Sequence, residues 1–177
     1  VGSEMCIRDS YLEMTVALMK HFGVNASFEG STVRVPTGAY RPASYHVEPD
    51  WSAISYWCAI AALANKADIL LPGVVCDYLQ GDRVVIDLMK DLGVKSTFES
   101  GGLRLAGGGQ VSRQITVDFQ WCPALAQTIL PVCAALRVNG VFSGLQSLRI
   151  KETDRITALE AELSKVGALL VESYDIW

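Results

Sequence analysis

The chain contains Leu18-Met19-Lys20-His21-Phe22-Gly23-Val24 and, 70 positions later, the similar run Leu88-Met89-Lys90-Asp91-Leu92-Gly93-Val94. A looser third copy follows at Leu163-Ser164-Lys165-Val166-Gly167-Ala168. Each copy is typical of the end of an amphipathic helix, where a glycine in the left-handed conformation closes the last turn. The three copies therefore predict three helices that end at corresponding positions of a repeated unit.

Two short β-type runs follow each of these helix ends. They are Asn25–Phe28 with Thr32–Val35, Lys95–Phe98 with Gly102–Leu105, and Ala168–Glu172 with the end of the chain. A second pattern also repeats: the run Ala-Ala-Leu at 61–63 precedes a glycine, and so does the same run at 134–136. It predicts two largely buried helices, Ser52–Asn65 and Pro123–Arg137. The unit has about 70 residues, longer than common solenoid repeats, and indicates an α/β (α+β) fold built from large pseudo-repeats.

Composition and charge argue against several classes of protein. Half of the 177 residues are hydrophobic and 19% are charged, as in a folded globular chain. The longest apolar runs, Trp57–Ala64 and Ile129–Leu136, fall short of the roughly 18–20 residues that cross a bilayer, so we expect no membrane association. A net charge of −4 and a pI of about 5.1 argue against nucleic-acid binding. Any anionic ligand therefore requires a local basic cluster.

The cysteines and histidines do not suggest a metal site. The five cysteines show no CxxC spacing, and His21 and His46 lie in separate segments. Four of the cysteines have apolar neighbours and are interpreted as small buried hydrophobic residues. We therefore expect no metal and a reducing, cytoplasmic setting.

The densest group of polar residues is the run Ser147-Leu148-Arg149-Ile150-Lys151-Glu152-Thr153-Asp154-Arg155. Its alternation predicts a strand with the odd-numbered residues on one face, followed by a helix that begins near Thr153. A helix N-terminus offers free N–H groups, so with Lys151 and Arg155 it predicts a site for phosphate or carboxylate. Glu152 is a candidate acid or base there. The alternative is a solvated helix start with ordinary i,i+4 ion pairs.

The run Leu148–Arg155 resembles the (L/W)R(V/I)KETDR motif of the 5-enolpyruvylshikimate-3-phosphate synthases. The run Val47–Trp57 is similar to the family's VE-x-D-x-S-x-A-S-Y segment, and Gln80–Asp82 and Tyr11–Thr15 also fit, in the family's order and spacing. The resemblance extends from Tyr11 to the end of the chain. Four ordered segments are much stronger support for the family than one motif.

The resemblance implies two globular domains, each assembled from three βαβαββ units, that close over their substrates at a hinge. It also implies an incomplete two-domain protein, because the family's proteins are more than twice as long. Residues 11–46 would end one enolpyruvyl transferase domain, and residues 47–177 would form part of the second domain after the hinge. Residues 1–10 do not fit the family and are interpreted as a non-native leader. The composition of Pro36–Asp50 suits the interdomain connection.

The implied reaction transfers the carboxyvinyl group of phosphoenolpyruvate to the 5-hydroxyl of shikimate 3-phosphate, a step of chorismate and aromatic amino acid biosynthesis that releases phosphate. These two small molecules are the implied partners, with no metal or organic cofactor and a monomeric protein. Carried over by position, Tyr11, Ser147 and Lys151 contact shikimate 3-phosphate. Arg155 binds phosphoenolpyruvate, and Glu152 beside it serves as acid and base. Glu152 and Lys151 are thus the implied catalytic residues.

Other charged residues of these motifs are interpreted as structural. Asp50 and Asp82 are predicted to cap helices or close turns, and Asp154 to cap or pair locally. Arg149 is expected to support its neighbours rather than touch a substrate.

One departure from the family pattern bears on catalysis. The family's general-base aspartate lies 27 residues before the motif lysine in a P-D-x-A-x-T context, and that position is Ala124 within the run Pro123–Thr128. An alanine cannot accept a proton, and loss of such a base costs a factor of about 10²–10⁴ in rate. A second departure is Arg8, at a position where the family has a substrate-binding serine.

Two alternatives remain open on the sequence. Ala124 favours a catalytically dead homologue that still binds substrate. The enolpyruvyl transferase that acts on UDP-N-acetylglucosamine shares the fold, although the run Lys151–Arg155 argues against it. Under each interpretation we expect no synthase activity from this chain alone, because much of the family's active site lies outside it.

Overall fold

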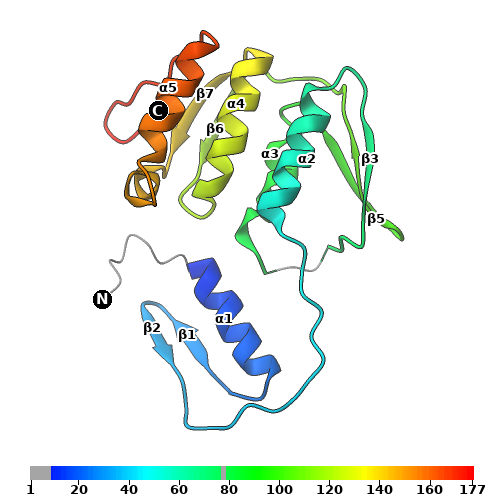
Figure 1. The fold of residues 1–177 in the computed structure, drawn as a ribbon, viewed down its shortest axis with the longest axis vertical. Helices are drawn as coiled ribbons and strands as arrows, with labels where there is room; N and C mark the ends of the chain where they lie inside the picture. Colours follow the sequence, from blue (N-terminus) through cyan, green and yellow to red (C-terminus); the bar gives the residue numbers. More distant parts are fainter. Residues whose placement is uncertain (1–8, 77–78) are drawn as a thin grey trace. The chain divides into compact units, whose positions relative to one another are not determined.

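The computed structural model describes residues 9–76 and 79–177, so Cys6 and Arg8 lie outside the described residues. The chain divides into two compact units, one ending at Glu48 and the other spanning Pro49–Trp177. Each unit is drawn in Figure 1.

The first unit is a helix followed by a hairpin. It contains α1 (Asp9–His21), β1 (Ser27–Glu29) and β2 (Thr32–Arg34), and the two strands pair antiparallel. The predicted connection Pro36–Asp50 contains no helix or strand. Its early part returns to the end of α1, where Arg41 N donates to Phe22 O over 2.7 Å.

The second unit contains two α/β halves, which Figure 1 shows in turquoise to green and in yellow-green to red. The first half comprises α2 (Trp51–Leu63), β3 (Asp68–Pro72), the 3-10 helix η2 (Gly81–Val84), α3 (Val85–Leu88), β4 (Lys95–Glu99) and β5 (Gly102–Ala106). The second half comprises β6 (Gln114–Asp118), η3 (Pro123–Leu125), α4 (Ala126–Leu136), β7 (Asn139–Ser143), η4 (Gln146–Ile150) and α5 (Arg155–Lys165).

The two halves pair their strands differently. In the first half, β5 lies between β3 and β4 and is antiparallel to both. In the second half, β6 and β7 are parallel and α4 forms the crossover between them. The unit is therefore a mixed α/β structure, as the repeats predict.

The core of the second unit lies around α2 and α4, which pack against each other, with α5 on the other side of α4 (Figure 1). The bounds of both helices agree with the predicted ones to within three residues. α4 is largely buried, as predicted, whereas α2 is buried on one face only, and its Tyr56, Trp57, Ile60 and Leu63 are exposed. Cys58 of α2 and Cys133 of α4 are buried, and this desolvation raises the pKa of each thiol to about 12. Cys122 is also buried, whereas Cys76 is exposed.

The repeated glycines close turns with the predicted geometry, after full helices in the first and third copies but only after the single-turn α3 in the second. Gly23, Gly93 and Gly167 have φ values of 91°, 83° and 80°. In each copy the glycine N–H bonds to the carbonyl three residues earlier, and the next N–H bonds to the carbonyl five residues earlier. These are the two bonds of the Schellman motif, so the three copies share one local structure.

The strand predicted at Ala168–Glu172 is wrong. The segment forms no ladder, and after it Ser173 and Ile176 form an isolated bridge. A strand requires a partner along its length. Among the described residues, the edge of β7 opposite β6 is paired through Phe142, which exchanges two main-chain hydrogen bonds with Trp177 at 2.7 and 2.9 Å.

None of the helices in the described part of the chain has the length and apolarity needed to cross a membrane.

Candidate functional site

The first half of the polar run is a 3-10 helix rather than the predicted strand. η4 spans Gln146–Ile150, and Leu148 N donates to Leu145 O over 2.9 Å. Side chains three residues apart lie on one side of a 3-10 helix, and Leu145 and Leu148 are both fully buried. Ile150, which strand alternation would place beside Leu148, is 42% exposed. Burial at i and i+3 therefore outweighs the alternation that suggested a strand.

The free helix N-terminus predicted after this run is already occupied by a carboxylate. Asp154 is the N-cap of α5, and its Oδ1 accepts from Ile156 N at 3.0 Å and Thr157 N at 3.1 Å. The pKa of Asp154 is held below its usual range, mainly by the hydrogen bonds from the N–H and the hydroxyl of Thr157. The bond from Ile156 N contributes less. The interpretation of Asp154 as a cap is confirmed. An anion at this junction must be bound by side chains rather than by these N–H groups.

Arg155 joins α5 to the start of α4. One guanidinium nitrogen, Nη1, donates to Gln127 Oε1 at 2.8 Å, and the other, Nη2, donates to Glu152 Oε2 at 2.5 Å. The pKa of Glu152 is lowered, first by a hydrogen bond from its own main chain and then by Arg155. Glu152 is therefore ionised at neutral pH in the unliganded chain, and it must take up a proton before it can act as an acid.

Lys151 is the cation at this junction without an ion pair among the described residues, although its charge helps to lower the pKa of Glu152. Neither Lys151 nor Ser147 makes a hydrogen bond or ion pair with another residue in the described ranges, and both are half-buried. Arg149 differs, since it pairs with Asp154 at 3.4 Å and with Glu172. Its charge is thus balanced within the fold, in agreement with its predicted supporting role.

The structure brings Ala124 to the same region. Ala124 is half-buried in η3, which packs against η4. Gln127, the partner of Arg155, follows Ala124 by three residues, about one helical turn. The residue at the predicted general-base position is thus close to the polar run, and it carries no ionisable group.

Tyr11 belongs to the first unit, near the start of α1. Its side chain is 45% exposed, and its main-chain carbonyl accepts a 2.8 Å hydrogen bond from the Thr15 hydroxyl. Its contribution to the site stays a prediction.

The aspartates of the other two motifs meet at the start of α2. Asp50 caps this helix through Ser52 N at 2.9 Å, which confirms its interpretation as a cap. Asp82 lies within η2, 2% exposed, and its Oδ2 accepts from the Ser52 hydroxyl at 2.5 Å. Asp82 is therefore a buried acceptor for a distant helix, a role that its local sequence did not reveal.

Two hydroxyl groups missed by the sequence reasoning connect α2 to α4. Ser55 Oγ and Thr128 Oγ1 lie 2.9 Å apart, and both residues are buried. The sequence signal that was available is a polar residue on the buried face of each helix, at the point where apolar residues are expected.

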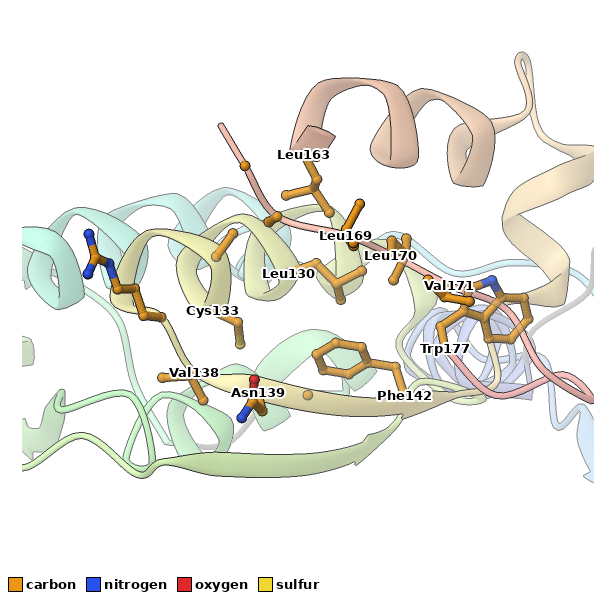
Figure 2. Close-up of a pocket in the computed structure, with 15 residues that line it drawn as sticks. Leu130, Cys133, Val138, Asn139, Phe142, Leu163, Leu169, Leu170, Val171 and Trp177 are labelled. Carbon is orange, nitrogen blue, oxygen red and sulfur yellow. The ribbon is translucent and has the colours of Figure 1, made fainter. Parts of the chain in front are cut away.

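A pocket of about 480 Å³ lies away from these residues, between α4, β7 and the C-terminal segment (Figure 2). Most of the residues that line it have apolar side chains, among them Leu130, Phe142, Leu163 and Trp177. It contains none of the predicted site residues. In the described part of the chain, no group of three His, Cys, Asp or Glu side chains is arranged to hold a metal ion.

The comparisons with known proteins agree with these motifs. A family model described as EPSP synthase (3-phosphoshikimate 1-carboxyvinyltransferase) matches residues 2–177. Similar proteins named 3-phosphoshikimate 1-carboxyvinyltransferase come from Bacteroides fragilis, 42% identical over 166 residues, and Methanothermobacter thermautotrophicus, 33% identical over 165 residues. Each alignment covers 93% of this chain, and 40% and 39% of the respective relatives. The chain thus spans about two-fifths of the length of these curated relatives. It belongs to the EPSP synthase family, which accounts for its α/β fold.

Proposed function

We propose that this member of the EPSP synthase family is part of an enzyme that transfers the carboxyvinyl group of phosphoenolpyruvate to shikimate 3-phosphate and releases phosphate. The observation that carries the proposal is the junction of η4 and α5, where Lys151, Glu152 and Arg155 lie beside η3 and the start of α4. Two anionic substrates require such cations, and a reaction that moves protons requires an ionisable group beside them.

In the proposed reaction, the 5-hydroxyl oxygen of shikimate 3-phosphate bonds to the enol carbon of phosphoenolpyruvate. The hydroxyl proton passes to a base, and the methylene carbon of phosphoenolpyruvate gains a proton from an acid. The tetrahedral intermediate then loses phosphate and a methyl proton, which restores the double bond. Ser147, Lys151 and Tyr11 are proposed to bind shikimate 3-phosphate, Arg155 to bind phosphoenolpyruvate, and Glu152 to exchange the proton at its methylene carbon.

The ion pair between Glu152 and Arg155 supports these roles. A phosphoenolpyruvate anion at Arg155 competes with Glu152 for the guanidinium, so its binding removes one of the interactions that keep the pKa of Glu152 low. Binding thereby shifts Glu152 toward the protonated form that an acid requires. The proposal also includes a monomeric, cytoplasmic protein with no metal or organic cofactor.

A binding experiment on this chain tests the ligand assignment. Shikimate 3-phosphate and phosphoenolpyruvate are titrated into the isotope-labelled chain, together and separately, with chemical-shift changes as the readout. We expect Lys151→Ala and Arg155→Ala to weaken binding at least about tenfold, since each removes a charge-assisted contact. Lys165→Ala is the matched control, because Lys165 is exposed and pairs with Glu162 at the far end of α5. Equal losses in all three variants, or binding of a UDP-sugar instead, would contradict the assignment.

Ala124 favours a second candidate function, a homologue that binds substrate without turnover. The two candidates differ in what the full-length protein does with bound substrate. Phosphate release on mixing it with both substrates supports the enzyme, whereas binding without phosphate release supports the inactive homologue. We expect the 177-residue chain alone to release no phosphate above background.

A further inference from the structure

A line of buried and partly buried hydrogen bonds runs from η2 through α2 to α4. Asp82 accepts from Ser52 Oγ at 2.5 Å, Ser55 Oγ donates to Ser52 O at 2.6 Å, and Ser55 Oγ lies 2.9 Å from Thr128 Oγ1. Ser55 has one hydroxyl proton, which it donates to Ser52 O, so Thr128 is the donor to Ser55. The direction of each bond in the line is thereby determined.

Burying the polar side chains of this line costs free energy, and packing alone does not explain why polar residues are found at these positions. Ser55, Asp82 and Thr128 are 1%, 2% and 6% exposed, and they are the buried polar residues among the described ones. Apolar residues of the same shape are often at least as stabilising at such positions, whereas a directional hydrogen bond defines one arrangement of the helices. The bond between Ser55 and Thr128 therefore favours one rotation of α4 about its axis relative to α2, the same one that buries the apolar face of α4.

That rotation determines where Gln127 points. Gln127 and Thr128 are consecutive in the first turn of α4, so their side chains leave the helix about 100° apart. Thr128 faces α2 in the core, and Gln127 is exposed and accepts the 2.8 Å hydrogen bond from Arg155. A rotation that satisfies Thr128 therefore also brings Gln127 to the guanidinium.

We propose that Thr128 and Ser55, supported by Ser52 and Asp82, are positioning residues that hold Gln127 against Arg155 and so orient the guanidinium for an anionic substrate. The identity of that substrate as phosphoenolpyruvate rests on the proposed function. The same rotation sets the direction of residue 124, because η3 leads directly into α4. Residues of η2, α2 and α4, which are distant in sequence, thus orient Arg155.

The first experiment needs no ligand. Thr128→Val removes the hydroxyl and keeps the shape, whereas Thr128→Ser keeps the hydroxyl. NMR signals of the Gln127 side-chain amide and the Arg155 guanidinium are compared with those of the unmodified chain, and Arg155→Lys assigns the arginine signal. We expect both signals to shift in Thr128→Val and to stay in Thr128→Ser. Ser55→Ala repeats the test if Thr128→Val fails to fold.

A matched control separates positioning from general stability. Val94 is buried but belongs to the turn before β4, where its N–H bonds to Met89 O, so Val94→Ala lowers the melting temperature through a change outside α2 and α4. We expect it to leave the Gln127 and Arg155 signals unchanged. Unchanged signals in Thr128→Val, or equal shifts in Val94→Ala, would overturn the proposal.

A titration with phosphoenolpyruvate then connects position to binding. We expect Thr128→Val to weaken binding about tenfold, since misplacing a substrate-orienting group carries penalties of this order, and Thr128→Ser to bind within about twofold of the unmodified chain. If the unmodified chain binds no phosphoenolpyruvate, the ligand assignment of the proposed function fails. The positioning inference is then decided by the NMR signals alone.

Discussion

The two central helices begin from similar sequences but start in different ways. Pro49-Asp50 precedes α2, and Pro123-Ala124 stands 74 positions later, before α4. Asp50 caps α2 through its side chain. At Ala124 the chain instead makes the 3-10 turn η3, with Leu125 N bonded to Cys122 O at 3.0 Å, and α4 begins without a side-chain cap.

α4 therefore forms without a carboxylate at position 124. The 3-10 turn satisfies main-chain groups that a capping side chain would otherwise bond. A carboxylate at this position in the family pattern is therefore better explained by chemistry than by folding. The carboxylate of Asp50, by contrast, is used within the fold.

The largest expected effect is on turnover, when position 124 before α4 is given the aspartate that stands at position 50 before α2. In the full-length protein, we expect Ala124→Asp to raise turnover about 10²–10⁴-fold, because it supplies the missing base. Phosphate release with both substrates is the measurement. Ala124→Asn is the matched control, since an asparagine caps a helix but does not accept the proton. An equal gain from Ala124→Asn would mean that the side chain acts through the helix start instead.

The next effect concerns the hydrogen bond from the Ser52 hydroxyl of α2 to Asp82, which has no counterpart in α4. The position equivalent to Ser52, 74 residues later, is Ala126. We expect Ser52→Ala to lower the free energy of unfolding by about 2 kcal/mol, because it removes a hydrogen bond to the buried Asp82 carboxylate. Urea denaturation measures this loss. Ser52→Thr keeps the hydroxyl, and a loss as large as that of Ser52→Ala would show that packing rather than the bond is responsible.

A smaller effect is expected when the α2 start is made to resemble the α4 start. Asp50→Ala removes the cap bond to Ser52 N and should cost about 1 kcal/mol of unfolding free energy. Asp50→Asn retains an oxygen acceptor and should cost less than half as much. Thermal and urea unfolding of the two variants provide the comparison, and identical losses would exclude capping as the cause.

The smallest effect is at the opposite ends of these helices. Arg137 follows α4 with a left-handed φ of 58°, whereas Ala64 follows α2 with an extended φ of −79°. A glycine adopts the left-handed conformation without steric cost, so we expect Arg137→Gly to stabilise the chain by about 0.5–1 kcal/mol. Ala64→Gly should give no gain, because Ala64 is unstrained. Melting temperatures measured side by side test this contrast.

Much of the fold was predictable because its signals are local. The glycines that close α1 and α5 and the apolar runs of α2 and α4 act within a few residues of themselves. The β1–β2 and β4–β5 hairpins follow from short runs separated by tight turns. Ala168–Glu172 fails as a strand because pairing depends on a partner, which its own sequence does not contain.

The sequence predicted which residues form the candidate site as a group, but it did not predict the contacts that these residues make with the rest of the fold. The motifs identify Lys151, Glu152 and Arg155 as a group, and their chemical types indicate an anion site. The predicted strand before them is a 3-10 helix, because burial of Leu145 and Leu148 decides its conformation. Asp154 caps α5, as predicted, and thereby occupies the N–H groups that the predicted anion site treated as free.

The repeated glycine turns, the positions of the two central helices, the family and the missing carboxylate at Ala124 were predictable from the sequence, since each depends on residue type or local spacing. The tertiary structure decided that Gln127 meets Arg155, that Thr128 meets Ser55 and that Asp82 accepts from Ser52. These partners are between 28 and 73 residues apart in the sequence. No local propensity relates them, and only the packing of η2, α2, α4 and α5 brings them within hydrogen-bonding distance.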